Sequence, residues 1–253
     1  GYFDVRFEPG GAAFAPGWHA VELTLPARVD TAVSATGEAL VPPADAAFAV
    51  ISDIDDTVLQ THATSLLRMA RTTLLNRAED RLPFAGVAAF YQALRAGPSG
   101  EEANPIFYLS SSPWNLYDLL VEFMALNDIP KGPLILQDYG FDDGKRLKLS
   151  HAEHKLVRIR ELLDRYATLP FVLIGDSGEH DPELYAQTIE EYPGRVRAVY
   201  IRDVSDRQRD AAVRELARQA EAQGVDLVLT SDSTVAAAHA AKIGLIDPDA
   251  LDA

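Results

Sequence analysis

The chain has 253 residues, of which 47% are hydrophobic and 24% are charged. This composition is typical of folded globular proteins and excludes collagen-like repeats, coiled coils and general disorder. There are 23 Lys and Arg against 38 Asp and Glu, a net charge of −15, so we expect no nucleic-acid partner, because such partners need a basic surface. The absence of cysteine excludes disulfides, thiolate metal sites and cysteine catalysis.

Residues 1–46 predict a small β unit. Apolar and polar residues alternate over 2–7 and 18–25, with Gly and Pro between them, which is typical of strands. The unit is too small to close its own core, so we interpret it as the last strands of a β-sandwich whose beginning is absent, with a linker at 41–43. Because the chain opens on Gly1 and not on Met, we expect an upstream segment to have been lost, and targeting stays open.

Residues 47–253 predict one α/β domain. Short apolar runs without alternation are typical of strands covered on both faces. They lie at 49–52, 106–109, 134–136, 171–174, 196–201 and 227–229. Helical periodicity separates them, and the alternating order predicts a doubly wound parallel sheet with helices on both faces. Such sheets bind ligands beyond the carboxyl ends of their strands, which is where the search for a site begins.

Acidic side chains follow two of these strands. Asp53, Asp55 and Asp56 come at the end of the first strand, where adjacent carboxylates repel each other unless a cation offsets them. The fourth strand ends at Asp176, and Asp181 follows soon after. If the two strand ends are neighbours, Asp53 and Asp176 would offer oxygens to one Mg²⁺. The alternatives are an Asp-rich turn at the first strand, and a helix cap and a turn residue at the fourth.

The second strand ends in three serines. Pro113 suits the first turn of the next helix, so Ser112 is expected to be its N-cap. Ser110, at the end of the strand, is the better ligand candidate, because its hydroxyl and the neighbouring backbone N–H groups would cradle a phosphate. Lys155 opens the helix before the fourth strand and would meet the same phosphate. Its alternative is an ordinary solvated lysine.

These pieces resemble, in order, the four motifs of the haloacid dehalogenase-like phosphatases. They are Asp53-x-Asp55-x-Thr57, Ser110, Lys155, and Asp176 followed by Asp181. The longer strings at 51–58, 108–117, 132–134 and 174–183 resemble the catalytic domain of the actin-patch-protein type of phosphatidate phosphatases, bacterial relatives included. The resemblance covers about residues 47–203. It implies a haloacid dehalogenase-like Rossmannoid fold over 47–253, with a small helical cap at about 60–103.

The resemblance also implies a mechanism. Asp53 would attack phosphorus and form an aspartyl-phosphate, and Asp55 would protonate the leaving alkoxide and then activate water. Mg²⁺ would be held by Asp53, the backbone carbonyl of Asp55 and Asp176. Asp181 would orient metal-bound water or Lys155.

The same resemblance implies that Ser110 and Lys155 bind the phosphate and hold its equatorial oxygens. Ser111 is an alternative to Ser110. Lys145 and Lys148 are alternatives to Lys155, which is preferred because it opens the helix before the metal-binding strand.

The cap carries the expected substrate contacts. Within 65–77, Arg68 and Arg71 lie among leucines and form a local positive, amphipathic helix, which would touch lipid headgroups and present a phosphate to the site. The alternative is a cap helix that packs its leucines on the core and leaves its arginines in solvent. Thr57 is grouped with the substrate-binding residues, although we expect it to brace the motif loop.

The leading hypothesis is an Mg²⁺-dependent phosphatase that converts phosphatidate, or a similar lipid phosphate, to diacylglycerol and phosphate. The first alternative is the same chemistry on a soluble phosphomonoester. The second is a non-catalytic phosphate-binding module, which the loss of an acidic motif residue would have favoured. We expect a cytoplasmic protein with peripheral membrane contact through the cap, and the oligomeric state stays open.

Overall fold

The computed structural model describes residue 10 and residues 14–25, 33–59, 84–137, 151–205 and 207–251. Four residues predicted to contact the substrate or its phosphate lie outside these ranges. They are Arg68, Arg71, Lys145 and Lys148. The predictions made for them stay predictions, as does the helical cap predicted at about 60–103, of which 60–83 lies outside the described residues.

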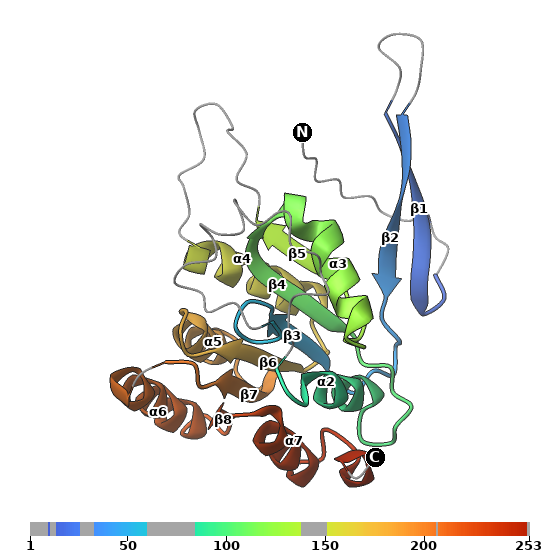
Figure 1. Cartoon of the computed structure of the whole chain (residues 1–253). Helices are drawn as coiled ribbons and strands as arrows, with labels where there is room; N and C mark the ends of the chain where they lie inside the picture. The colour runs from blue at the N-terminus through green and yellow to red at the C-terminus, as the bar shows by residue number, and fades with distance from the viewer. Residues whose placement is uncertain are drawn as a thin grey trace.

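The centre of the fold is a parallel sheet of six strands (Figure 1). The strands are β3 (Ala49–Asp53), β4 (Ile106–Pro113), β5 (Leu134–Gln137), β6 (Phe171–Asp176), β7 (Val196–Arg202) and β8 (Asp226–Thr230). Their order is β5-β4-β3-β6-β7-β8, with parallel pairing throughout. The chain builds outward from β3 to β5, then returns to place β6 on the other side of β3. The order therefore reverses between β3 and β6, and a ligand crevice is expected at their carboxyl ends.

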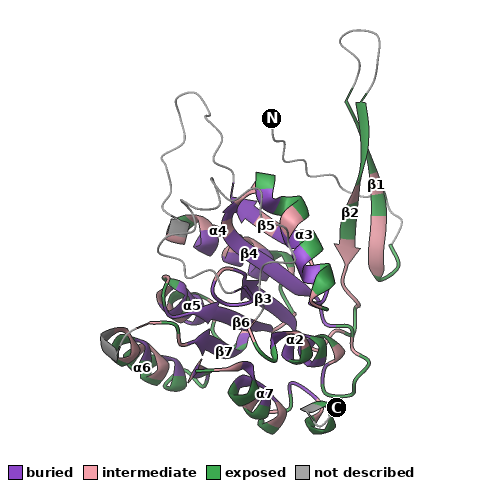
Figure 2. Cartoon of the chain, in the orientation of Figure 1, coloured by how far each residue is buried: buried purple, intermediate pink, exposed green. Residues whose placement is uncertain are grey.

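Helices cover both faces of the sheet, as predicted. One face carries α2 (Val87–Ala96), α3 (Tyr117–Leu126) and α7 (Ser233–Lys242). The other carries α4 (His151–Arg165), α5 (Asp181–Glu191) and α6 (Arg207–Glu221). Figure 2 shows the strands buried between helices whose outer surfaces are exposed. Among the helices in the described ranges, none has the length and apolar character that crossing a bilayer requires.

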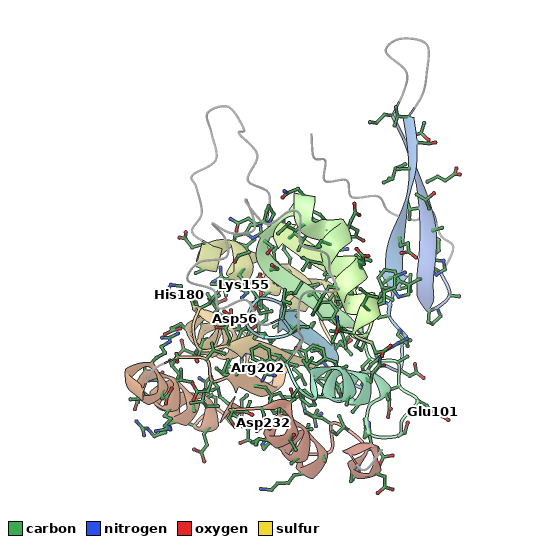
Figure 3. All side chains as sticks on the ribbon, viewed as in Figure 1. Asp56, Glu101, Lys155, His180, Arg202 and Asp232 are labelled. Carbon is green, nitrogen blue, oxygen red and sulfur yellow. The ribbon has the colours of Figure 1, made fainter. Side chains whose placement is uncertain are left out.

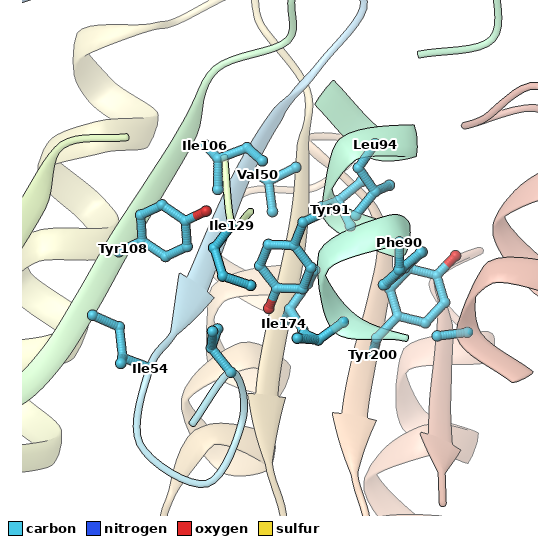
Figure 4. Close-up of a cluster of buried hydrophobic side chains, with 14 of the residues drawn as sticks. Val50, Ile54, Phe90, Tyr91, Leu94, Ile106, Tyr108, Ile129, Ile174 and Tyr200 are labelled. Carbon is cyan, nitrogen blue, oxygen red and sulfur yellow. The ribbon is translucent and has the colours of Figure 1, made fainter. Parts of the chain in front are cut away.

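Two apolar cores result from the alternation of side chains along each strand. Val50 of β3 joins the core under α2, whereas Ile51 joins the core under α4, and both are fully buried. Figure 4 shows the first core, in which the rings of Tyr91 and Tyr108 stack with their centroids 6.3 Å apart. Burying an aliphatic side chain such as that of Val50 or Ile51 contributes roughly 2 kcal/mol to the stability of the fold. Strands with two apolar faces explain why the sequence shows runs without alternation.

The N-terminal strands form a separate antiparallel hairpin beside α3 (Figure 1). It consists of β1 (Gly17–Leu25) and β2 (Val33–Val41), and most of its residues are exposed. Lys131 of the main domain attaches it, since its Nζ lies 2.7 Å from Glu38 and 4.4 Å from the centroid of the Trp18 ring. The strand predicted at 18–25 is confirmed. The one predicted at 2–7 lies outside the described residues, and the β-sandwich stays a prediction.

Candidate active site

The first acidic motif lies at the end of β3, in the centre of the sheet. Asp53 is the last residue of the strand and is 1% exposed. A tight loop follows, in which the Ile54 carbonyl accepts hydrogen bonds from the backbone N–H groups of Val58 (2.9 Å) and Leu59 (3.0 Å). Asp56 has a φ of 53°, a left-handed conformation that lets the chain turn back within a few residues. The loop thus keeps Asp53 and Asp55 at the carboxyl edge of the sheet.

Asp53, Asp176 and Asp181 converge on one point. One carboxylate oxygen of each lies within 4.8 Å of the others, and all three side chains are buried. β3 pairs with β6, and Asp53 and Asp176 are the last residues of these two neighbouring strands. Gly175 makes room for the third, because a Cβ at that position would lie only 2.2 Å from Asp181 Oδ2. The predicted meeting of two acidic strand ends is therefore present.

This cluster has unsatisfied polar atoms. Both carboxylate oxygens of Asp53, and Oδ2 of Asp176, are buried and accept no hydrogen bond from the described residues, although Oδ1 of Asp53 forms an ion pair with Lys155. Burial, opposed by Lys155 and reinforced by Asp181, raises the pKa of Asp53 well above its usual range. Burial and then the Asp181 charge raise the pKa of Asp176 to about 7. Several carboxylates with unused oxygens fit a hard divalent cation, which prefers oxygen ligands and supplies the missing positive charge.

Lys155 supplies part of that charge. It lies in the first turns of α4 and is only 6% exposed, so its interpretation as a solvated lysine is wrong. Its Nζ donates a hydrogen bond to Asp181 and lies 2.9 Å from Asp53 Oδ1. Burial alone would lower the pKa of Lys155, but the charges of Asp181 and Asp53 outweigh it and raise that pKa. The ammonium group therefore stays charged beside the aspartates.

Asp55 is held apart from the three-aspartate cluster by two serines. Its Oδ2 accepts hydrogen bonds from the hydroxyls of Ser110 (2.8 Å) and Ser112 (3.1 Å). The prediction of Ser112 as an N-cap is wrong, because β4 continues to Pro113 and a 3₁₀ turn, Trp114–Leu116, begins there without a side-chain cap. In an extended strand, residues two apart face the same side, so Ser110 and Ser112 reach Asp55 together.

The remaining predicted residues surround this centre. Ser111 lines a small hollow together with Ser110, Lys155 and His154. Thr57 is buried in the loop after Asp55, and its hydroxyl has no hydrogen-bond partner among the described residues. Figure 3 labels Asp56 and Lys155, which mark this edge of the sheet.

A comparison with known protein families matches residues 48–203 to the model of the family described as "Phosphatidate phosphatase APP1, catalytic domain". The match extends over more than half of the chain. The chain belongs to this family. All the aspartates, serines and the lysine described above fall inside the matched range, whereas β8 and α7 lie beyond it.

Two curated proteins are similar to the chain. Phosphatidate phosphatase APP1 of Saccharomyces cerevisiae is 33% identical over 162 residues, covering 64% of this chain and 27% of the relative. The Schizosaccharomyces pombe protein "Uncharacterized protein C29B5.04c" is 30% identical over 161 residues, covering 62% of this chain and 25% of the relative. The chain thus spans about a quarter of the length of these relatives.

Sequence reasoning missed Glu179 as a neighbour of the site. Its Oε2 lies 3.6 Å from Lys155 Nζ, and burial raises its pKa. Asp176 Oδ1 accepts hydrogen bonds from the backbone N–H groups of Gly178 (2.7 Å) and Glu179 (3.0 Å), which forms the turn that brings Glu179 inward. An aspartate two residues before a glycine is typical of such turns, so this signal was present in the sequence.

Proposed function

We propose that this chain is an Mg²⁺-dependent phosphatase that hydrolyses phosphatidate, or a related lipid phosphate monoester, through an aspartyl-phosphate on Asp53. The observation that carries the proposal is the buried Asp53 carboxylate, whose Oδ1 forms an ion pair with Lys155 and whose Oδ2 has neither a hydrogen bond nor an ion pair among the described residues. Such a carboxylate can act as a nucleophile and can also bind a metal ion. Membership of the APP1 catalytic-domain family supports the lipid substrate, as does the name of the S. cerevisiae relative.

The residues that would hold the metal are Asp53, Asp176 and Asp181, together with the backbone carbonyl of Asp55. When bound there, Mg²⁺ would offset the negative charge that the nucleophile and the phosphoryl group share. The orphaned carboxylate oxygens and the raised pKa of Asp176 support this assignment.

The chemistry divides between two carboxylates. An oxygen of Asp53 forms a bond to phosphorus while the bond from phosphorus to the leaving alkoxide breaks, and Asp55 gives the alkoxide its proton. Asp55 then takes a proton from water, whose oxygen attacks phosphorus and releases phosphate and Asp53. Lys155 and Ser110 hold the oxygens of the phosphoryl group during both steps. The two serine hydroxyls that donate to Asp55, a residue outside the three-aspartate cluster, support this division.

The test is phosphate release from short-chain phosphatidate and from soluble sugar and nucleotide monoesters, each with Mg²⁺ and with EDTA. We expect Mg²⁺-dependent release from phosphatidate that Asp53→Asn abolishes and that the matched exposed variant Asp118→Asn retains. Release from the soluble esters alone would replace the lipid substrate with a soluble phosphomonoester. Binding of phosphate without turnover of any ester would favour a non-catalytic module.

A further inference from the structure

Arg202 is a buried cation that the proposed chemistry leaves unexplained. It ends β7, pairs in register with Asp176 of the neighbouring strand, and is only 8% exposed. None of the ion pairs among the described residues involves it. Burial lowers its pKa, which reflects the unfavourable transfer of a charge out of water. A buried guanidinium outside these ion pairs must act through the hydrogen bonds that its N–H groups donate in fixed directions.

Those donors reach the loop that carries Asp55. Arg202 Nε donates to the backbone carbonyl of Thr57 (3.2 Å), and Nη2 donates to the hydroxyl of Ser233 at the start of α7 (2.9 Å). The guanidinium also lies over the ring of Phe84, 4.0 Å from its centroid. Figure 3 labels Arg202 at this point of the sheet. One side chain thus joins β7, α7 and the loop after β3.

Arg202 supplies a side-chain donor to the backbone of this loop, which otherwise bonds to backbone groups, such as Asp56 N–H to the Leu59 carbonyl (2.8 Å). The Ile54 carbonyl accepts bonds from inside the loop, and the Val58 carbonyl accepts one from the Phe84 N–H (3.3 Å). The Thr57 carbonyl accepts from Arg202. A buried carbonyl that loses its donor is unfavourable, so the loop would rearrange to find another. Asp55 lies two residues before Thr57 and would move with it.

We infer that Arg202 is a positioning residue that fixes the aim of Asp55 during proton transfer to the leaving group. The inference rests on the proposed function. It has a specific signature, because an alkoxide needs the proton from Asp55 and a nitrophenolate leaves without one. Loss of Arg202 should therefore slow the cleavage of alkyl phosphates more than that of aryl phosphates, as Asp55→Asn should.

The experiment compares Arg202→Met and Arg202→Lys with the control Arg195→Met. Arg195 also donates to backbone carbonyls (Leu163, Tyr166 and Leu169) and lies near the Phe171 ring, but at the opposite end of β7. We expect kcat/KM for short-chain phosphatidate, which covers the steps up to formation of the aspartyl-phosphate, to fall about tenfold to a hundredfold in the Arg202 variants. For p-nitrophenyl phosphate we expect kcat/KM to fall less than about threefold, since its leaving group needs no proton in that step. Hydrolysis of the aspartyl-phosphate, in which Asp55 takes a proton from water, is common to both esters and affects kcat alone.

A second readout does not require activity. Amide hydrogen exchange in residues 54–59 should accelerate in the Arg202 variants and stay unchanged in Arg195→Met. If Arg202→Met does not fold, both measurements are made on Arg202→Lys, which keeps the positive charge but loses the planar arrangement of N–H donors. Equal losses in kcat/KM on the two esters, or unchanged exchange in the loop, would overturn the inference. Inactivity of the wild-type protein on both esters would instead refute the proposed function, and the exchange measurement would still decide whether Arg202 holds the loop.

Discussion

Asp176→Asn should stabilise the metal-free protein while weakening its response to Mg²⁺. Burial raises the pKa of Asp176 from 3.8 to about 7. A folded-state pKa above the unfolded value means that the folded protein holds the proton more tightly, so stability falls as the pH rises from about 4 to about 7. Each unit of difference between the folded and unfolded pKa corresponds to about 1.4 kcal/mol. Above pH 7 the fully ionised carboxylate therefore lowers the free energy of unfolding by about 4 kcal/mol. Asparagine avoids this cost, and its carbonyl oxygen can still accept from Gly178 and Glu179.

Urea unfolding in EDTA between pH 5 and pH 8 measures this difference directly. We expect Asp176→Asn to be more stable than wild type at pH 8 by as much as about 4 kcal/mol, and the gap to narrow toward pH 5. Added Mg²⁺ should stabilise the wild type more than the variant, because a ligand that binds only the folded state raises stability. Asp118→Asn, on the exposed face of α3, should behave as wild type throughout. A variant less stable than wild type in EDTA at pH 8, or an equal gain from Mg²⁺, would refute the reasoning.

Three further variants test the packing of the site and of the opposite edge of the sheet. Gly175→Ala should abolish phosphate release and Mg²⁺-dependent thermal stabilisation, because its Cβ would displace Asp181, whereas Gly37→Ala in the exposed hairpin should change neither. Asn104→Ala should lower the free energy of urea unfolding by about 3 kcal/mol, since its buried amide bonds the N–H of Ala47 and Phe48 and the carbonyl of Leu94, which would lose their partners. Ser112→Ala should lower kcat about threefold to tenfold without changing the melting temperature, because Asp55 keeps only one serine donor; an unchanged kcat would contradict its role.

The sequence by itself determined the α/β class, the parallel sheet and the strand ends that carry the acidic motifs. These features follow from local patterns: strands buried on two faces require apolar runs, and a parallel sheet brings its carboxyl ends to one edge. The pairing of β3 with β6 then makes Asp53 and Asp176 neighbours. Lys155 could be proposed from its place before β6, but the sequence left open whether it was buried.

Only the tertiary structure decided the contacts between segments distant in the chain. Ser112 was predicted to cap a helix, and it instead binds Asp55, because β4 continues as far as Pro113. Arg202 gave no signal in the sequence, since an arginine at a strand end is usually solvated, and its donors find the Thr57 carbonyl only after β7 and the β3 loop have packed together. The physical reason is that periodicity reports which side of an element is apolar, whereas hydrogen-bond partners depend on register, strand length and loop conformation. Those quantities are determined by packing across the whole domain.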